Sequence, residues 1–181
     1  MKFDTGYIIR YMLHYNTGIP CAVFIAVSFL VGSIVVLLFW TKSSYSLFMK
    51  QASICILIGY VFLVLCATVF FRDETFVKRY DLLPFRSYTI LYNRLLAQLI
   101  MNVMMFIPIG FFASGALKKK ILWNVVGIGF LVSLFIEMTQ LITTRGVFSV
   151  DDIIHNTLGC VLGFACFVLC QKLMRSQLKQ C

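Results

Sequence analysis

Polar residues interrupt the apolar stretches of the second half of the chain, and their chemistry stands out. They are Asn102, Glu137, Gln140, Asp151, Asp152, His155 and Asn156. On helices, residues three or four positions apart share a face, so Gln140 lies on the face of Glu137, and each aspartate shares a face with His155 or Asn156. Ionisable groups inside membrane-length apolar segments are rare and mark functional sites. This cluster is therefore the candidate site.

Several roles are compatible with these residue types. Amides and a carboxyl from different helices can hydrogen-bond across a bundle, at an average of about 0.6 kcal/mol per bond. They can equally bind the polar head of an amphiphile, supply acid–base catalysis through Glu137, Asp151 or His155, or carry protons or ions. A buried carboxyl is costly unless it is protonated or paired, with Arg94 or Arg145 as candidate partners. Asp151 or Asp152 could instead cap a helix.

We predict no metal site and no cofactor. Asp151, His155 and Glu137 carry atoms that bind metals, but the other histidine, His14, is distant in the sequence. The chain contains no P-loop, dinucleotide-binding fingerprint or nucleophile elbow. The seven cysteines form no C-x-x-C pair and are typical of small buried hydrophobic residues.

The composition places the cluster in a membrane. Apolar residues make up 61% of the 181 residues and charged residues 13%, against about 45–50% and about 25% in soluble domains. A soluble protein of this size cannot bury so much apolar surface, which excludes a soluble enzyme and a nucleic-acid-binding domain. The net charge of +9 arises mainly between the apolar runs, which is typical of contacts with anionic lipid headgroups.

Five apolar runs are long enough to cross a bilayer as helices, which need about 20 residues for about 30 Å of hydrocarbon. The runs are Ile19–Trp40, Ser53–Phe71, Leu95–Leu117, Ile121–Ile142 and Ile153–Cys170. Apolar residues share one helical face before residue 18, which predicts a short helix at the interface. We therefore expect an all-α, polytopic membrane helix bundle with five transmembrane helices and a short N-terminal interfacial helix.

The orientation follows only weakly from charge. Five crossings place the N-terminus and the loops over residues 72–94 and 143–152 on one side, and each side carries eight basic residues. The dense triplet Lys118–Lys120 favours the opposite side as cytoplasmic. We expect a multi-pass protein of the cell membrane with its N-terminus and these two loops outside and its C-terminus in the cytoplasm.

Four segments, in order, resemble motifs of the VanZ-like membrane protein family. They read D-L-L-P-F-R at 81–86, N-x-x-x-F-x-P-x-G at 102–110, S-x-x-x-E-x-x-Q at 133–140, and R, D-D, N-T-x-G and G between 145 and 163. The family is named for a protein associated with low-level resistance to teicoplanin, a lipid-tailed glycopeptide, and most members have no established activity. The resemblance implies that the motif loops lie outside the cytoplasm. An additional helix before the motifs and His155 depart from the family pattern.

The resemblance and the polar cluster together lead to our functional hypothesis. We expect recognition of an amphiphilic cell-envelope molecule, such as a lipidated glycopeptide or an anionic cell-wall lipid, and a contribution to teicoplanin resistance. The alternative is an integral-membrane enzyme that acts on a lipid or cell-wall precursor through Glu137 and Asp151 or Asp152. The predicted binding residues are Asn102, Glu137, Gln140, Arg145, Asp151, Asp152, Asn156, Arg86 and Arg94.

The same patterns predict structural residues and a division of the chain. Pro108 should kink its helix, and a G-x-x-x-G pair permits close helix packing. The predicted structural residues are Pro84, Pro108, Gly110, Gly159 and Gly163. We divide the chain into an interfacial segment (1–18), an additional transmembrane helix with its loop (19–52), a VanZ-like four-helix membrane domain (53–170) and a basic C-terminal tail (171–181). The expected partners are membrane lipids and no nucleic acid.

Overall fold

The computed structural model describes residues 45–70, 72, 79–84, 92–117 and 122–178. Helices make up nearly all of this part: α3 (Tyr45–Leu65), α4 (Tyr92–Ala116), α5 (Leu122–Thr143) and α6 (Val150–Leu178). A short π-helix, η1 (Cys66–Phe70), continues α3. The structure thus has the all-helical architecture that the sequence predicts, with a small sheet that the sequence analysis missed.

Four helical segments in the described part are long and apolar enough to cross a membrane. They cover Lys50–Phe70, Leu96–Ala116, Leu122–Thr143 and Val150–Leu173, close to the last four predicted runs. The first predicted run, Ile19–Trp40, and the predicted interfacial helix lie outside the described residues. Helix α6 continues to Leu178, so most of the predicted basic tail is helical.

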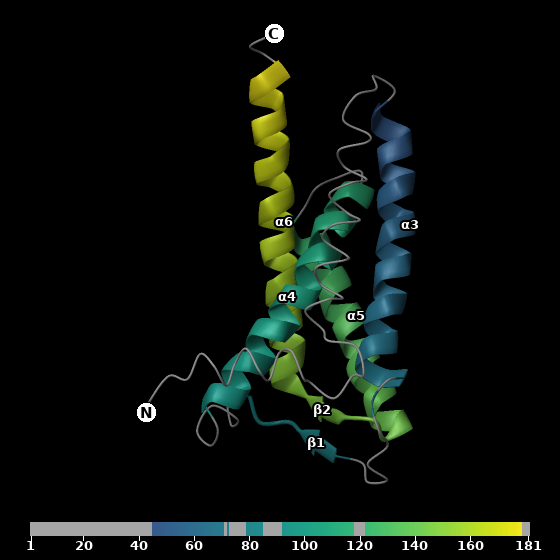
Figure 1. The fold of residues 1–181 in the computed structure, drawn as a ribbon, viewed down its shortest axis with the longest axis vertical. Coiled ribbons are helices and arrows are strands. Elements are labelled where there is room, and N and C mark those ends of the chain that lie inside the picture. Colours follow the sequence, from purple (N-terminus) through teal and green to yellow (C-terminus); the bar gives the residue numbers. More distant parts are fainter. Residues whose placement is uncertain (1–44, 71, 73–78, 85–91, 118–121, 179–181) are drawn as a thin grey trace.

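Helix α4 lies at the centre of the described bundle and packs on α6, α3 and α5 (Figure 1). Its contact with α6 is close because glycines line it. A Cβ atom on Gly110 would meet the backbone of Cys160, and a Cβ on Gly163 would lie 2.7 Å from the Phe111 nitrogen. Small residues bring backbones together, and membrane helices associate through such packing. Helix α4 continues through Pro108 to Ala116.

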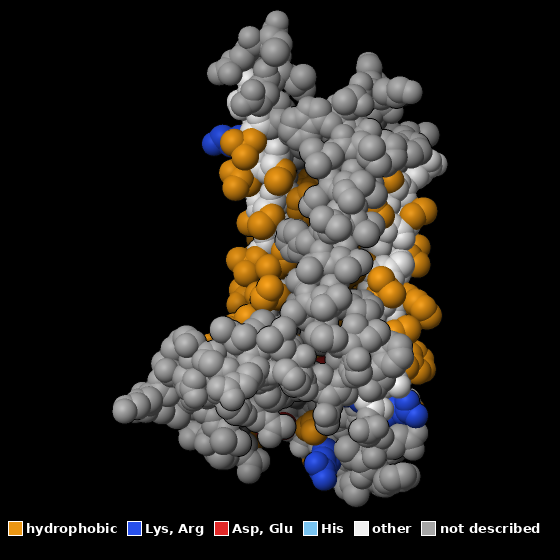
Figure 2. Space-filling model, in the orientation of Figure 1, with side chains coloured by type: hydrophobic (Ala, Val, Ile, Leu, Met, Phe, Trp, Pro, Cys, Tyr) orange, Lys and Arg blue, Asp and Glu red, His pale blue; other side chains and the backbone are white. Residues whose placement is uncertain are grey.

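The bundle is apolar inside and along its sides. Buried side chains such as Phe106, Ile109, Val125 and Cys160 fill the interior. Large apolar side chains are exposed around the helices, including Trp123 at 77%. Figure 2 shows apolar side chains along the length of the bundle, and the described lysine and arginine side chains that are visible on this face lie near its ends. An apolar exterior of this kind suits a lipid surrounding.

Two short strands lie at the end of the bundle where α5 ends and α6 begins (Figure 1). Strand β1 (Arg79–Asp81) pairs in parallel with β2 (Val147–Ser149). Pro84 is exposed in the turn after β1, where the Leu83 amide donates to the Asp81 carboxylate at 3.4 Å. The sheet fixes the segment between α5 and α6, from which the candidate site is partly built.

Candidate functional site

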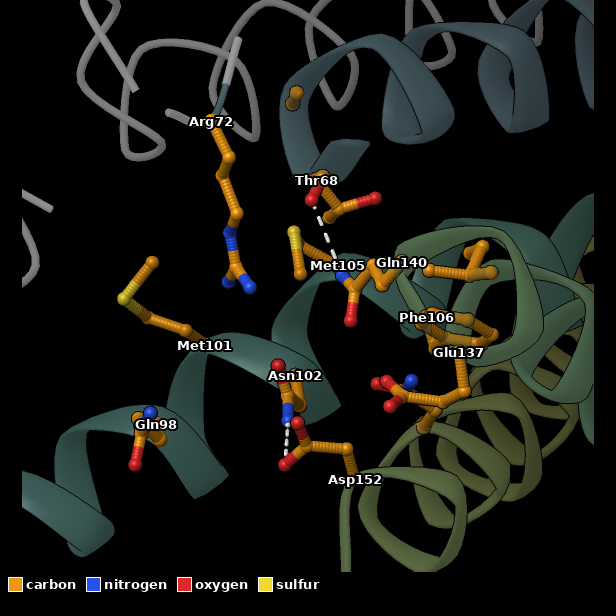
Figure 3. A pocket seen from close by; sticks show the side chains of 13 residues that line it. Thr68, Arg72, Gln98, Met101, Asn102, Met105, Phe106, Glu137, Gln140 and Asp152 are labelled. Atoms are coloured by element: carbon orange, nitrogen blue, oxygen red, sulfur yellow. Dashed lines mark hydrogen bonds between the residues drawn. The ribbon is translucent and has the colours of Figure 1, made fainter. Parts of the chain in front are cut away.

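A polar pocket lies at the strand end of the bundle, between η1, α4, α5 and α6 (Figure 3). Its volume is about 30 Å³, and a cavity needs about 10–15 Å³ to hold one water molecule. Its polar lining consists of Thr68, Arg72, Gln98, Asn102, Glu137, Gln140, Asp152 and Asn156. Phe106 and Ile136 contribute apolar wall. The space therefore suits one small polar group.

Two carboxyls on different helices face this space. Glu137 of α5 is only 2% exposed, and its Oε2 accepts a hydrogen bond from the Ser149 amide at 2.9 Å. Asp152, in the first turn of α6, accepts a hydrogen bond from Asn102 Nδ2 at 2.8 Å. The two carboxyls also interact electrostatically. Each is therefore held in place by a neighbouring element, and together they bring two acidic groups to one pocket.

Helix capping does not fully account for Asp152. The cap of α6 is the hydroxyl of Ser149, which accepts the Asp152 amide at 3.4 Å. The carboxylate of Asp152 points instead towards α4, where Asn102 donates to it. A carboxylate in a first helical turn still interacts favourably with the helix dipole, but its side chain is directed into the pocket.

Arg72 supplies the positive charge of the pocket. It lies two residues after the end of η1, and its guanidinium points towards Asn102, Glu137 and Asp152 in Figure 3. Its charge acts on both carboxyls. The sequence predicts Arg94 or Arg145 as the partner of Glu137. The structure places Arg72 beside Glu137, Arg145 does not line the pocket, and the side chain of Arg94 lies outside the described part.

The end of η1 is anchored to α5 by two side chains. Gln140 Nε2 donates to the Thr68 carbonyl at 3.1 Å, and Arg145 Nη1 donates to the Phe70 carbonyl at 2.9 Å. Carbonyl groups at a helix end need partners of this kind because no further turn follows. Both bonds fix the backbone just before Arg72. Gln140 and Arg145 therefore position the pocket arginine.

The turn that carries Arg145 has an unusual backbone. Thr144 adopts a positive φ of 56°, and the Arg145 amide donates to the Gln140 carbonyl at 3.1 Å. This is the pattern of a helix that ends through a left-handed residue, a place where glycine is preferred. The sharp ending directs the chain into β2.

Asn156 lies at the α5–α6 side of the pocket and is 4% exposed. Its Nδ2 donates to the Ser133 hydroxyl at 2.8 Å, which fixes the amide. Its Oδ1 is buried and accepts no hydrogen bond from the residues that the structure describes. Buried polar atoms are nearly always bonded, so this oxygen is an acceptor available to a bound group.

The chain also matches a sequence model of a known family. The model, described as VanZ/LLP1, matches residues 57–171, which is more than half of the chain. The chain belongs to the VanZ/LLP1 family. The resemblance drawn from the four motifs is thereby confirmed. Searches of curated proteins and of solved structures give no match.

The VanZ/LLP1 match contains all four motifs, and the pocket brings several of their polar residues together. Those that line it are Asn102, Glu137, Gln140, Asp152 and Asn156. Asp151 is buried but does not line the pocket. Arg145 does not line the pocket either. Arg86 lies outside the described residues, and of Arg94 only the backbone, in α4, is described. Ligand binding by these residues stays a prediction.

Other residues of this VanZ/LLP1 protein contribute to the pocket without having been predicted. Arg72 closes an apolar run and could be read as an ordinary interfacial anchor. Gln98 precedes Asn102 by four residues, a spacing that places both on one helical face and indicates Gln98 as a candidate from the sequence. Thr68 and Ser149 contribute backbone atoms, for which sequence gives no signal. Within the described residues, no group of three or more His, Cys, Asp or Glu is arranged to hold a metal ion.

Proposed function

We propose that this protein recognises the polar head of an amphiphilic cell-envelope molecule. The observation that carries the proposal is the buried acceptor Asn156 Oδ1 in a pocket that also contains Arg72 and two carboxyls. A cluster that served only to hold helices together would have no reason to leave a buried acceptor without a bond. It would also be a costly way to hold helices, because buried charges lose hydration.

The position of the pocket supports a ligand with an apolar tail. The pocket lies at one end of spans whose sides are apolar. A polar head could occupy it while the tail remains among the exposed apolar side chains of the helices. A lipidated glycopeptide and an anionic cell-wall lipid are the candidate ligands, and binding the former would contribute to teicoplanin resistance. The proposal includes the orientation with the pocket towards the outside of the cell.

The proposal is tested by Glu137→Gln, which preserves shape while removing the charge. We expect normal expression and a loss of the envelope phenotype, measured as teicoplanin susceptibility in a host that carries the gene. Asp152→Asn should behave likewise. The matched control is Asp81→Asn, outside the pocket lining, where the amide oxygen can still accept the Leu83 amide.

The phenotype separates the possible outcomes. Full resistance in both pocket variants at equal expression would show that the charges are unnecessary, and an architectural role would then account for them. If the parent protein itself confers no resistance, the association with teicoplanin does not extend to this chain, and direct binding becomes the decisive measurement.

One observation favours an enzyme as the second candidate. Glu137 and Asp152 interact across a pocket with room for one small molecule, and a carboxyl pair of this kind can divide the roles of acid and base. A lipid or cell-wall precursor would be the substrate. Of the two aspartates that the sequence suggested, Asp152 is the one that lines the pocket. Formation of a product that depends on Glu137 would favour this candidate, whereas saturable binding without a product favours recognition.

A further inference from the structure

We infer that the group recognised in the pocket is a protonated primary amine, held between Glu137, Asp152 and Asn156. This inference rests on the proposed function and narrows it, because it names the chemistry of the ligand head. Three properties of the pocket support it: its surplus of hydrogen-bond acceptors, its charge and its size.

The amides of Asn102 and Asn156 add hydrogen-bond acceptors to the lining. The amide nitrogens of Asn102 and Asn156 already donate to Asp152 and to the Ser133 hydroxyl. The Asn156 oxygen accepts no bond from the described residues. Carboxylates are acceptors only, and a primary ammonium group offers three donors and no acceptor. A donor-rich head is therefore the better complement to this wall of the pocket.

The charge of the lining favours the same chemistry. Among the described residues that line the pocket, the two acidic side chains are Glu137 and Asp152 and the basic one is Arg72. With all three groups ionised, the lining carries a net negative charge that burial makes costly. An ammonium group would balance this charge. A head that carries only negative charge would meet both carboxylates, although Arg72 could attract an anionic group attached beside the amine.

The size of the pocket favours a compact cation over a bulkier one. Its volume of about 30 Å³ is a few times the roughly 10–15 Å³ that a cavity needs to hold one water molecule. A primary ammonium matches this size, whereas a trimethylammonium group is larger and has no N–H to donate. Two sources can supply the same chemistry: the headgroup of an amine-bearing lipid or lipidated molecule, and a small amine free in solution.

The inference is tested by titrating the purified full-length protein, in a non-ionic detergent, with lysolipids of identical tail. Lysophosphatidylethanolamine carries a primary ammonium, lysophosphatidylcholine a trimethylammonium, and lysophosphatidylglycerol no cation. Phosphoethanolamine without a tail represents the free amine. We expect lysophosphatidylethanolamine to bind at least about tenfold more tightly than either other lysolipid, and phosphoethanolamine to bind weakly.

Variants connect this preference to the pocket. Glu137→Gln and Asn156→Leu should each reduce the preference for the ammonium about tenfold. The matched control is Asn124→Leu on α5, where the asparagine is exposed and outside the lining. The temperature of unfolding is measured for each protein. If Asn156→Leu fails to fold, Glu137→Gln, which preserves the side-chain shape, decides the result.

The results distinguish this inference from the function on which it rests. Equal affinity for the ethanolamine and choline lysolipids, or a preference for the glycerol lysolipid, would overturn the ammonium assignment and leave amphiphile recognition standing. If phosphoethanolamine binds more tightly than its lysolipid, the assignment of an ammonium group stands and the recognition of an amphiphile is contradicted. If no probe binds above a detergent control, both the ammonium assignment and recognition of such heads are wrong.

Discussion

Adding one methyl group at Gly159 should separate the two helices that hold the pocket together. A Cβ there would meet the carbonyl oxygen of Val103 and lie 2.8 Å from the Cβ of Phe106. Ordinary van der Waals contact begins near 3.4 Å, so α4 and α6 must move apart by at least about 0.6 Å. Neither atom can avoid the contact by a side-chain rotation. Overpacking of this size costs about 1–3 kcal/mol.

The same displacement should reach the pocket. Val103 is the neighbour of Asn102, whose Nδ2 lies 2.8 Å from the Asp152 carboxylate across the two helices. A separation of about 0.6 Å would lengthen this bond to about 3.4 Å, which would weaken it. Gly159→Ala is therefore expected to weaken ligand binding in addition to lowering the free energy of unfolding.

The assay is equilibrium unfolding of the purified protein in detergent micelles, with binding measured on the same samples. Gly127→Ala on α5 and Gly59→Ala on α3 are matched controls because their added methyl groups would meet nothing within 4 Å. Each control should be neutral or stabilising by up to about 1 kcal/mol, since alanine favours helices. Equal stability of Gly159→Ala and the controls would refute the close contact. Lower stability with unchanged binding would refute the link to the pocket.

Further predictions concern the turn after α5 and the orientation. Thr144→Gly should raise the free energy of unfolding by about 1 kcal/mol in the same assay, because glycine adopts the φ of 56° without strain. If the free energy of unfolding does not rise, the hydrogen bonds of the threonine side chain offset the backbone strain. Arg145→Gln should lose the bond to the Phe70 carbonyl, at about 1 kcal/mol or less, and weaken binding through Arg72. In a background without reactive cysteines, Ser149→Cys but not Lys119→Cys should react with an impermeant thiol reagent from outside; labelling at 119 would reverse the orientation.

Much of the described fold could be predicted because a bilayer imposes few solutions. Apolar runs of membrane length must be helices, and the last four predicted runs coincide closely with the four spans. Helical spacing also explains why polar residues as distant in the sequence as Asn102 and Asn156 line one pocket. Each of the two residues lies six positions after the start of its span, at Leu96 and Val150 respectively.

The rest depends on contacts that have no period in the sequence. Strands β1 and β2 have three residues each, too few for an alternating pattern to be recognised. The role of Arg72 depends on how η1 ends, and this is set by bonds from Gln140 and Arg145 to backbone carbonyls. Sequence identified Arg145 as a cationic residue near the site, but it could not show that the guanidinium binds the chain itself.

The arrangement of polar groups also bears on whether ions cross this part of the protein. The polar lining ends at Phe106 and Ile136, and the next layer of the bundle contains Ile109, Val125 and Cys160, all fully buried. Towards the other end of the described bundle, the hydroxyl of Ser114 donates to the carbonyl of its own helix, Gly110, at 2.6 Å. An ion or proton path needs a succession of polar partners at membrane depth. In the described helices, the buried carboxyl and amide side chains lie at the strand end, and the buried polar side chains nearer the other end are hydroxyls such as those of Ser53 and Ser114. This distribution suits a site that receives a group from one side of the membrane better than one that passes it across.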